Sequence, residues 1–247
     1  MESIKVTADT LCKLARYDTP TICNVIELFD IRPRDTGYMD HRIKAAFPDF
    51  PPMVGFAATA TMRCASNLGQ STYDAMEAQL KLFEQLPGPA VVVFQDLDDP
   101  PVAATFGEVM CSTYKAFGAV GIITSGGGRD LDQVRALGFS AFTASTICSH
   151  GYTQIIDVGS PVRVGGLVVA SGDLLHGDCN GVTNIPLEIA AEVADAAEEF
   201  VAAEAHVLDY VKGSGQKTLS ELAVRRKAMG NAIATLRRRL SRAQAAL

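Results

Sequence analysis

The chain has 247 residues, of which 48% are hydrophobic, and a formal net charge of −6 at pH 7. This length is enough to bury a large core in one or two domains, and the negative charge argues against general affinity for nucleic acid or anionic membranes. Apolar runs such as residues 90–94 are far shorter than the roughly 20 residues that span a bilayer. The N-terminus lacks the basic and then apolar pattern of a signal peptide, so we predict a cytoplasmic protein.

Helices and strands alternate through the first half of the chain. Apolar residues recur at helical spacing from residue 10 to residue 29, and Pro20 is expected to divide this stretch into two short helices. Runs of β-branched residues predict buried strands, and Pro-Gly clusters predict helix ends. In chain order the other predictions are an irregular segment (31–54), a strand (55–63), a helix (73–85), a strand (90–94) and a helix from Gly107 to about residue 117.

A strand, three glycines and a charged pair then follow one another. Residues 118–124 predict a buried strand, and the glycines at 126–128 predict a loop that adopts positive φ and approaches a ligand closely. Arg129 and Asp130 open a helix predicted over 131–137. The free N–H groups and positive dipole end of a helix start favour an anion. The stretch therefore indicates an active site for an anionic substrate with a divalent metal ion.

A purely structural interpretation of the charged pair is also open. Asp130 and Gln133 have the spacing of a capping box, in which the aspartate caps the helix. Arg129 can pair with a surface carboxylate, which adds little stability. Local spacing alone does not decide between the two.

Short strands dominate from residue 139 to residue 169, and helices dominate after Pro186. Strands are predicted over 140–145, 153–158, 161–164 and 167–170, with tight turns at 171–173 and 178–181. This density predicts an α/β protein with a central mixed sheet or barrel-like layer flanked by helices. A helix over 187–210 is expected to begin near Asn184 and Pro186, and a last helix begins with a capping box from Thr218 to Glu221.

The last helix carries basic tracts at 225–227 and 237–239. A basic helix can bind RNA, but a solvated face or a surface that packs on a partner helix is commoner. The net charge of −6 disfavours RNA.

Six cysteines are scattered without metal-ligand spacing and are expected to be reduced and buried. Four histidines are equally dispersed. His150 and His176 are conceivable general bases, but spacing selects neither.

An ordered series of motifs between Gly107 and Pro186 resembles the family that contains class II pyruvate aldolases and regulators of ribonuclease activity A. The matching stretches are 107–110, 118–123, Arg129-Asp130, 136–142, 158–169, 171–173, 178–182 and 185–186. Residues 17–24 and 55–60 extend the resemblance more loosely towards the N-terminus. We therefore predict a family-type domain over 1–186, with its core motifs in 107–186, and a helical C-terminal extension over 187–247.

The resemblance implies a swivelling β/β/α fold and a homotrimer or a hexamer with active sites between subunits. It also implies one of two functions. The aldolases are metal-dependent lyases that cleave 4-hydroxy-2-oxo acids such as 4-hydroxy-4-methyl-2-oxoglutarate to pyruvate, and many also decarboxylate oxaloacetate. The ribonuclease regulators bind protein partners without such chemistry. The long segment after Pro186 favours the aldolase branch, because the regulators are shorter.

The family pattern also implies roles for individual residues. Asp130 would be the direct ligand of Mg²⁺ or Mn²⁺, and Glu108 would hold metal-bound water. Arg129 would bind the substrate carboxylate or enolate oxygen with its planar fork. The backbone N–H groups of Val109 and Met110, after Gly107, would bind the pyruvate carboxylate.

Simpler interpretations stand beside these roles. The helix dipole alone favours Glu108 in a first turn, and Gly107 can be an ordinary loop glycine. Turn formation is the commoner role for Asp173, Asp178 and Asn180.

Two positions depart from the aldolase pattern. Gln133 replaces an acidic residue, and Ser125 follows Thr124 where many relatives have an acidic residue before the loop. A further carboxylate is expected from a neighbouring subunit, with Glu188, Glu192 and Glu204 as the candidates.

Overall fold

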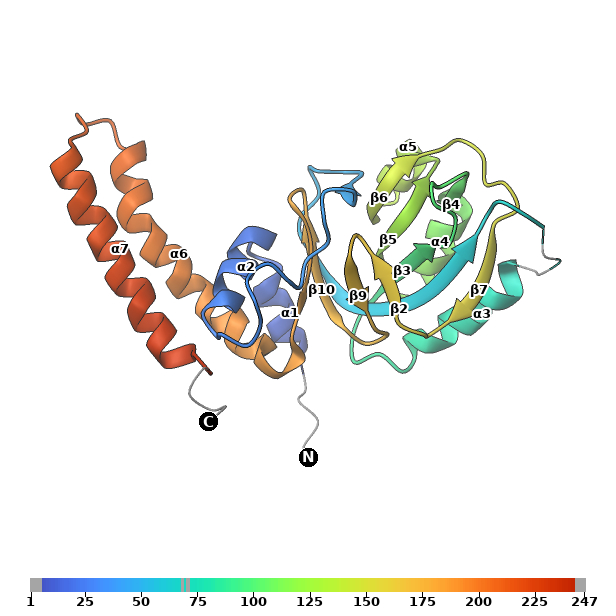
Figure 1. The fold of residues 1–247 in the computed structure, drawn as a ribbon, viewed down its shortest axis with the longest axis horizontal. Coiled ribbons are helices and arrows are strands. Elements are labelled where there is room, and N and C mark those ends of the chain that lie inside the picture. Colours follow the sequence, from blue (N-terminus) through green and yellow to red (C-terminus); the bar gives the residue numbers. More distant parts are fainter. Residues whose placement is uncertain (1–5, 68, 70–71, 243–247) are drawn as a thin grey trace.

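The computed structural model describes residues 6–67, 69 and 72–242, and it consists of a sheet-based body with two long helices at one end (Figure 1). The strands are β1 (Lys44–Ala45), β2 (Met53–Arg63), β3 (Ala90–Asp96), β4 (Ala104–Phe106), β5 (Ala119–Gly128), β6 (Ser140–Thr146), β7 (Gln154–Val158), β8 (Val162–Val164), β9 (Leu167–Val169), β10 (Leu174–Asp178) and β11 (Gly181–Ile185). The helices are α1 (Ala8–Leu14), α2 (Thr19–Glu27), α3 (Thr72–Phe83), α4 (Glu108–Ala116), α5 (Leu131–Ala136), the 3-10 helix η1 (Leu187–Ile189), α6 (Ala190–Lys212) and α7 (Leu219–Leu240).

The main sheet is mixed and follows the order β1-β6-β5-β3-β2-β10-β11, with β4 paired to β5 and β7 paired to β2. Its central strands β2, β3, β5 and β6 run parallel, so their carboxyl ends meet at one edge. The predicted mixed sheet flanked by helices is confirmed.

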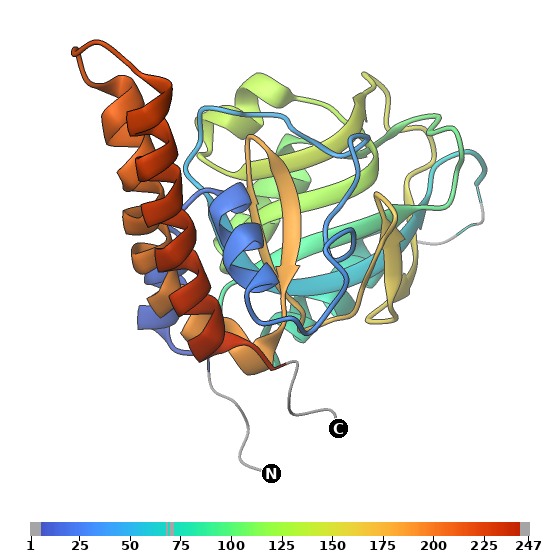
Figure 2. The same ribbon diagram turned by 60° about the vertical axis from the view of Figure 1, so that its left-hand side comes forward.

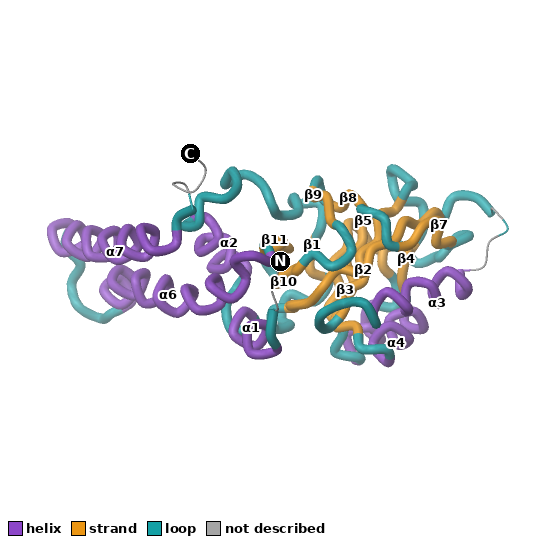
Figure 3. The backbone as a smooth tube through the Cα atoms, turned by 90° about the horizontal axis from the view of Figure 1, so that it is seen from below, coloured by secondary structure: helices purple, strands orange, loops and turns teal. Residues whose placement is uncertain are grey.

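Each face of the central sheet buries its own apolar cluster. Val92 and Phe94 of β3 point towards α3, α4 and α5, whereas Val91 and Val93 point towards β8, β9 and the segment around Ile43. Figure 3 shows α3 and α4 on one side of the sheet and β8 and β9 on the other. Because successive residues of a strand face opposite sides, a sheet covered on both faces needs an unbroken apolar run.

A third cluster joins the helical end to the body. The first half of α6 packs against α1 and α2, with Phe56 and Leu174 of the sheet in the same cluster. Helices α6 and α7 lie side by side in Figures 1 and 2. The domain boundary at residue 186 stays a prediction. Among the described residues, no helix combines the length and the apolar character that a membrane span needs.

The basic tracts of α7 contact carboxylates of the same chain. Arg239 pairs with Glu199 of α6 at 2.5 Å, and Arg237 pairs with Asp30. These pairs support the interpretation of the tracts as a surface that packs on neighbouring elements.

Several predicted boundaries differ from the structure. Pro20 lies in the first turn of α2, and the break between α1 and α2 falls before it, where Asp18 caps α2 by accepting from Thr21 N at 2.9 Å. Asn184 does not begin a helix but lies in β11, a strand that the turn residues in this part of the sequence do not predict. Strands β1, β4 and β10 were likewise not predicted. Cys64 and Cys111 are buried as predicted, whereas Cys23 is half-buried and Cys12, Cys148 and Cys179 are exposed.

The three glycines lie in β5 and not in the predicted loop. Strand β5 continues through Gly128 because β4 pairs with it there, with Phe106 opposite Gly128. A Cβ atom on Gly128 would lie 2.3 Å from Cζ of Phe106, and one on Gly126 would lie 2.6 Å from Oδ2 of Asp96. These glycines therefore permit close packing, and they do not adopt positive φ.

Candidate active site

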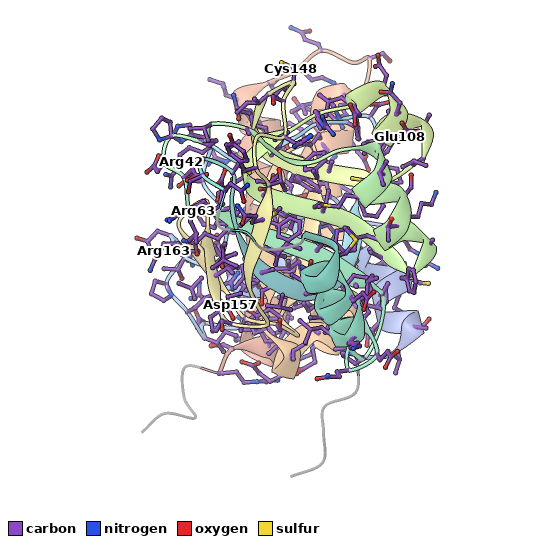
Figure 4. All side chains as sticks on the ribbon, turned by 90° about the vertical axis from the view of Figure 1, so that its right-hand side faces the viewer. Arg42, Arg63, Glu108, Cys148, Asp157 and Arg163 are labelled. Atoms are coloured by element: carbon purple, nitrogen blue, oxygen red, sulfur yellow. The ribbon has the colours of Figure 1, made fainter. Side chains whose placement is uncertain are left out.

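Strand β4 brings the start of α4 beside the residues that follow β5. Gly107 is the N-cap of α4, directly after β4, and the N–H of Arg129 donates to the carbonyl of Phe106 at 3.1 Å. Figure 4 shows Glu108 at the start of α4. The arrangement lies near the carboxyl ends of the parallel strands, where open α/β sheets bind ligands. The candidate residues predicted from sequence are thus brought together: Gly107, Glu108, Val109, Met110, Arg129 and Asp130.

Gly107 is required by its neighbours. A Cβ atom at this position would lie 2.6 Å from Oδ2 of Asp130 and 3.0 Å from Nε of Arg129. Any side chain would push both charged groups away, so Gly107 is more than an ordinary loop glycine.

The carboxylate of Asp130 turns towards α4 rather than capping α5. The backbone of Asp130 is left-handed (φ 54°, ψ 38°), and its side chain makes no capping hydrogen bond to α5. Instead, Oδ2 accepts from the N–H of Glu108 at 3.0 Å and lies 3.7 Å from Nε of Arg129. The predicted capping box with Gln133 is therefore wrong. Aspartate is one of the few residues that tolerate this conformation, and such strain concentrates at functional sites.

The start of α4 offers backbone donors to an anion. The N–H of Glu108 donates to Oδ2 of Asp130, and the N–H of Cys111 donates to the carbonyl of Gly107 at 3.0 Å. The two amides between them, those of Val109 and Met110, belong to the first turn, where N–H groups have no acceptor within the helix. The positive end of the helix dipole strengthens their attraction for a carboxylate.

These groups border a cavity of about 440 Å³. Its walls come from β4, from the start of α4, from Arg129 and from the segment 150–154, with Asn67 and Met76 completing it. Among the described lining residues, Arg129 carries a positive charge, His150 and Tyr152 have further hydrogen-bonding groups, and none is acidic. The cavity is therefore suited to an anion with an apolar portion.

The segment 150–154 is the part of the site that sequence reasoning missed. It contributes His150 and Tyr152, which lie about twenty residues beyond Arg129 in the chain. One signal was available: the segment follows β6, a strand parallel to β5, so its first residues emerge at the same edge of the sheet.

The donor set fits a hydrated divalent cation. Among the described residues, Oδ1 of Asp130 has no hydrogen-bond partner, and the Glu108 side chain is exposed beside it. No cluster of three or more His, Cys, Asp or Glu side chains with metal-binding geometry occurs in the described part of the chain. Mg²⁺ keeps several waters and is commonly held by one or two carboxylates, so Asp130 with Glu108 suits it.

The other expected carboxylates do not reach this site within one chain. Glu188, Glu192 and Glu204 belong to η1 and α6, at the helical end of the molecule, far from α4 (Figure 1). Glu192 also pairs with Arg242 at 2.5 Å.

The remaining polar candidates have structural roles. Asp173 accepts from Ala170 N at 2.8 Å, and Asp178 accepts from Asn180 N at 2.8 Å, as turn-forming residues do. His176 is fully buried, and burial lowers its pKa.

Asp96, at the end of β3, is a buried carboxylate outside the cavity. Its Oδ1 accepts from Asp98 N at 3.0 Å, and its Oδ2 has no hydrogen-bond partner among the described residues. Burial raises the pKa of Asp96 to about 6.

We expect Asp96→Asn to stabilise the protein at neutral pH but not at pH 4. The unfolded carboxyl ionises near pH 4, whereas the folded one stays protonated up to about pH 6. The wild type therefore loses stability as the pH rises through this window, and the neutral amide does not. Denaturant unfolding between pH 4 and pH 8 measures the free energy of unfolding of both proteins. The variant's advantage over the wild type should grow with pH to about 1–3 kcal/mol. A difference in the free energy of unfolding that does not change with pH would contradict this prediction.

A family model described as RraA-like: Aldolase/RraA matches residues 19–183. A protein of Halalkalibacterium halodurans named "Putative 4-hydroxy-4-methyl-2-oxoglutarate aldolase" is 32% identical over 136 residues. The match covers 54% of this chain and 60% of that protein.

Two solved structures share the fold. A Pseudomonas syringae pv. tomato protein superposes with a TM-score of 0.70 at 21% identity, covering 92% of this chain and 97% of that one. RraAS2 of Streptomyces coelicolor, described as an unusual member of the RNase ES inhibitor RraA protein family, has a TM-score of 0.64 at 23% identity. That match covers 81% of this chain and 96% of the other.

Proposed function

The chain belongs to the RraA-like (Aldolase/RraA) family, and from this premise we propose that it is a divalent-metal-dependent lyase. Its substrate would be a 4-hydroxy-2-oxo acid of the 4-hydroxy-4-methyl-2-oxoglutarate type, cleaved to release pyruvate, with oxaloacetate decarboxylation as a second activity. The observation that carries the proposal is the meeting of Arg129, Asp130 and the first amides of α4. Arg129, Val109 and Met110 also line the cavity, which has no acidic residue among its described lining residues.

The reaction requires negative charge to be stabilised on the substrate. In the retro-aldol step the C4 hydroxyl loses its proton to solvent, and the C4–O group becomes the carbonyl of the second product as the C3–C4 bond breaks. The electron pair of that bond forms the enolate of pyruvate, which then takes a proton at C3. Asp130 would hold the divalent cation, which would supply Lewis-acid stabilisation of the negative charge that develops on the substrate. Decarboxylation of oxaloacetate forms the same enolate, with carbon dioxide as the leaving group.

The chain's own groups then bind and orient the substrate. The Val109 and Met110 amides bind the carboxylate of the pyruvyl portion. The Arg129 guanidinium donates to the developing enolate oxygen or to the same carboxylate, and its planar fork sets the orientation of the bound group. Glu108 orients water at the mouth of the site.

We also propose that the protein is a trimer or a hexamer with sites between subunits. The candidate carboxylates of α6 lie far from α4 in one chain. A neighbouring chain is therefore the available source of a further acidic group.

A non-catalytic regulator of ribonuclease activity is the alternative. Gln133 and Ser125 stand where the aldolases have acidic residues, and Ser125 Oγ instead accepts from Asp96 N at 2.9 Å. This alternative predicts direct binding to an RNA-processing enzyme in a pull-down, with no turnover.

We expect pyruvate release to depend on a divalent cation. Oxaloacetate and 4-hydroxy-4-methyl-2-oxoglutarate are tested separately with Mg²⁺, Mn²⁺ or EDTA, and pyruvate is measured by coupling to lactate dehydrogenase. The protein-free rate with each metal is subtracted, because metal ions alone decarboxylate oxaloacetate. Release that EDTA abolishes supports the lyase. Release that is unchanged in EDTA would overturn the metal dependence, and no release from either acid would favour the regulator.

A further inference from the structure

The cavity has two ends, which are attached to opposite ends of β4. At one end of the strand, Phe106 O accepts from Arg129 N at 3.1 Å. At the other end, Ala104 N donates to Ser149 O at 2.7 Å, and Ala104 O accepts from Thr153 Oγ1 at 3.3 Å. A strand advances about 3.3 Å per residue, so the two attachment points lie roughly 7 Å apart.

The segment at the second end is held in place before any ligand arrives. Tyr152 N donates to Cys64 O at 3.0 Å, and Thr153 N donates to His150 O at 3.0 Å. Gly151 has a φ of +53°, and a Cβ atom there would lie 2.8 Å from Cys64 O. These contacts support the turn, in which His150 and Tyr152 line the cavity.

The His150 ring is oriented by its own turn. Its Nδ1 lies 2.8 Å from Gly151 O. Because a carbonyl oxygen only accepts, Nδ1 carries the hydrogen and Nε2 is left for a ligand. As an imidazolium, His150 donates from Nε2, and the phenol of Tyr152 donates from Oη.

We propose that His150 and Tyr152 form a distal subsite that binds the second carboxylate of a dianionic 2-oxo acid. The inference rests on the proposed function, because the Arg129 end is taken as the pyruvyl site. It assigns residues of this chain to the second carboxylate, which both proposed substrates carry, and predicts that a 2-oxo acid without that group binds more weakly. The lining of the cavity supports it. Arg129 lies at one end, His150 and Tyr152 belong to the segment at the other, and the described lining residues include no carboxylate. Met76 and Phe106 supply apolar surface for the carbons in between.

The test compares two acids of equal chain length. 2-Oxoglutarate and 2-oxopentanoate differ only in the terminal carboxylate, so the ratio of their dissociation constants isolates the distal subsite. Binding is measured by calorimetry with Mg²⁺ present, which requires no turnover. We expect the wild type to prefer 2-oxoglutarate at least tenfold and His150→Ala to lose that preference while binding 2-oxopentanoate unchanged. His206→Ala, at an exposed histidine of α6, should behave as wild type.

The outcomes separate this inference from the lyase proposal. Three results would each overturn the distal subsite. They are a preference for 2-oxoglutarate that persists in His150→Ala, an equal loss of affinity for both acids in that variant, and no binding of 2-oxoglutarate to the wild type. A His150-dependent preference in a protein that releases no pyruvate would support the subsite and count against the lyase alone. Tyr152→Phe removes only the hydroxyl and should reduce the preference partly.

Discussion

Asp130→Asn should abolish metal-dependent pyruvate release while leaving the fold intact. Lewis-acid stabilisation of a developing enolate is worth several kcal/mol, which corresponds to a loss of about 10³-fold or more in kcat/KM. Asparagine tolerates the left-handed backbone that Asp130 adopts (φ 54°). Its side-chain oxygen can still accept from Glu108 N. The variant therefore removes the charge and little else.

The measurement pairs turnover with folding. Asp132→Asn changes the next aspartate along, an exposed residue in the first turn of α5, and should keep full activity. Circular dichroism and thermal unfolding should match the wild type for both variants. Metal-dependent turnover at the wild-type rate in Asp130→Asn would remove the proposed mechanism.

Arg129→Lys keeps a positive charge but loses the planar fork, so we expect it to lower kcat/KM as well.

Gly128→Ala should be strongly destabilising, because the strand pairing leaves no room for a methyl group. The added Cβ would lie 2.3 Å from Cζ of Phe106, whose ring is 2% exposed. Overpacking of this kind costs about 1–3 kcal/mol, and occasionally more. Phe106 O also accepts from Arg129 N. Movement of Phe106 should therefore displace Arg129 and Asp130, and catalytic activity should fall together with stability.

Denaturant unfolding tests this with a matched glycine. Gly230 lies in α7 with nothing within 4 Å of an added Cβ, so Gly230→Ala should stabilise the protein by about 0.5–1 kcal/mol. In the double variant Gly128→Ala/Phe106→Leu, the smaller side chain should recover part of the lost stability. A Gly128→Ala protein as stable as the wild type would show that the glycine does not serve close packing.

Features carried by local sequence were largely predictable. The β-branched valine run of residues 90–94 predicts a buried strand, and the structure confirms it as part of β3. The run is unbroken because the sheet is covered on both faces. The last helix begins where its cap predicts, with Thr218 Oγ1 accepting from Glu221 N at 3.2 Å. Strands β10 and β11 are not predicted, because each is only five residues long and the turn residues between them dominate the local pattern. They are strands because β10 pairs with both β11 and β2.

By itself the sequence determined the mixed sheet with flanking helices, the helical C-terminal end and the candidate pair Arg129-Asp130, since periodicity, caps and adjacent charges are local properties of a chain. Only the tertiary structure decided what the glycines and the aspartate do. The glycines extend β5 because β4 packs against them, and the Asp130 carboxylate turns to α4 because that helix start lies beside it. His150 joins the cavity for the same reason, as parallel strands bring their following segments to one edge whatever their separation in sequence.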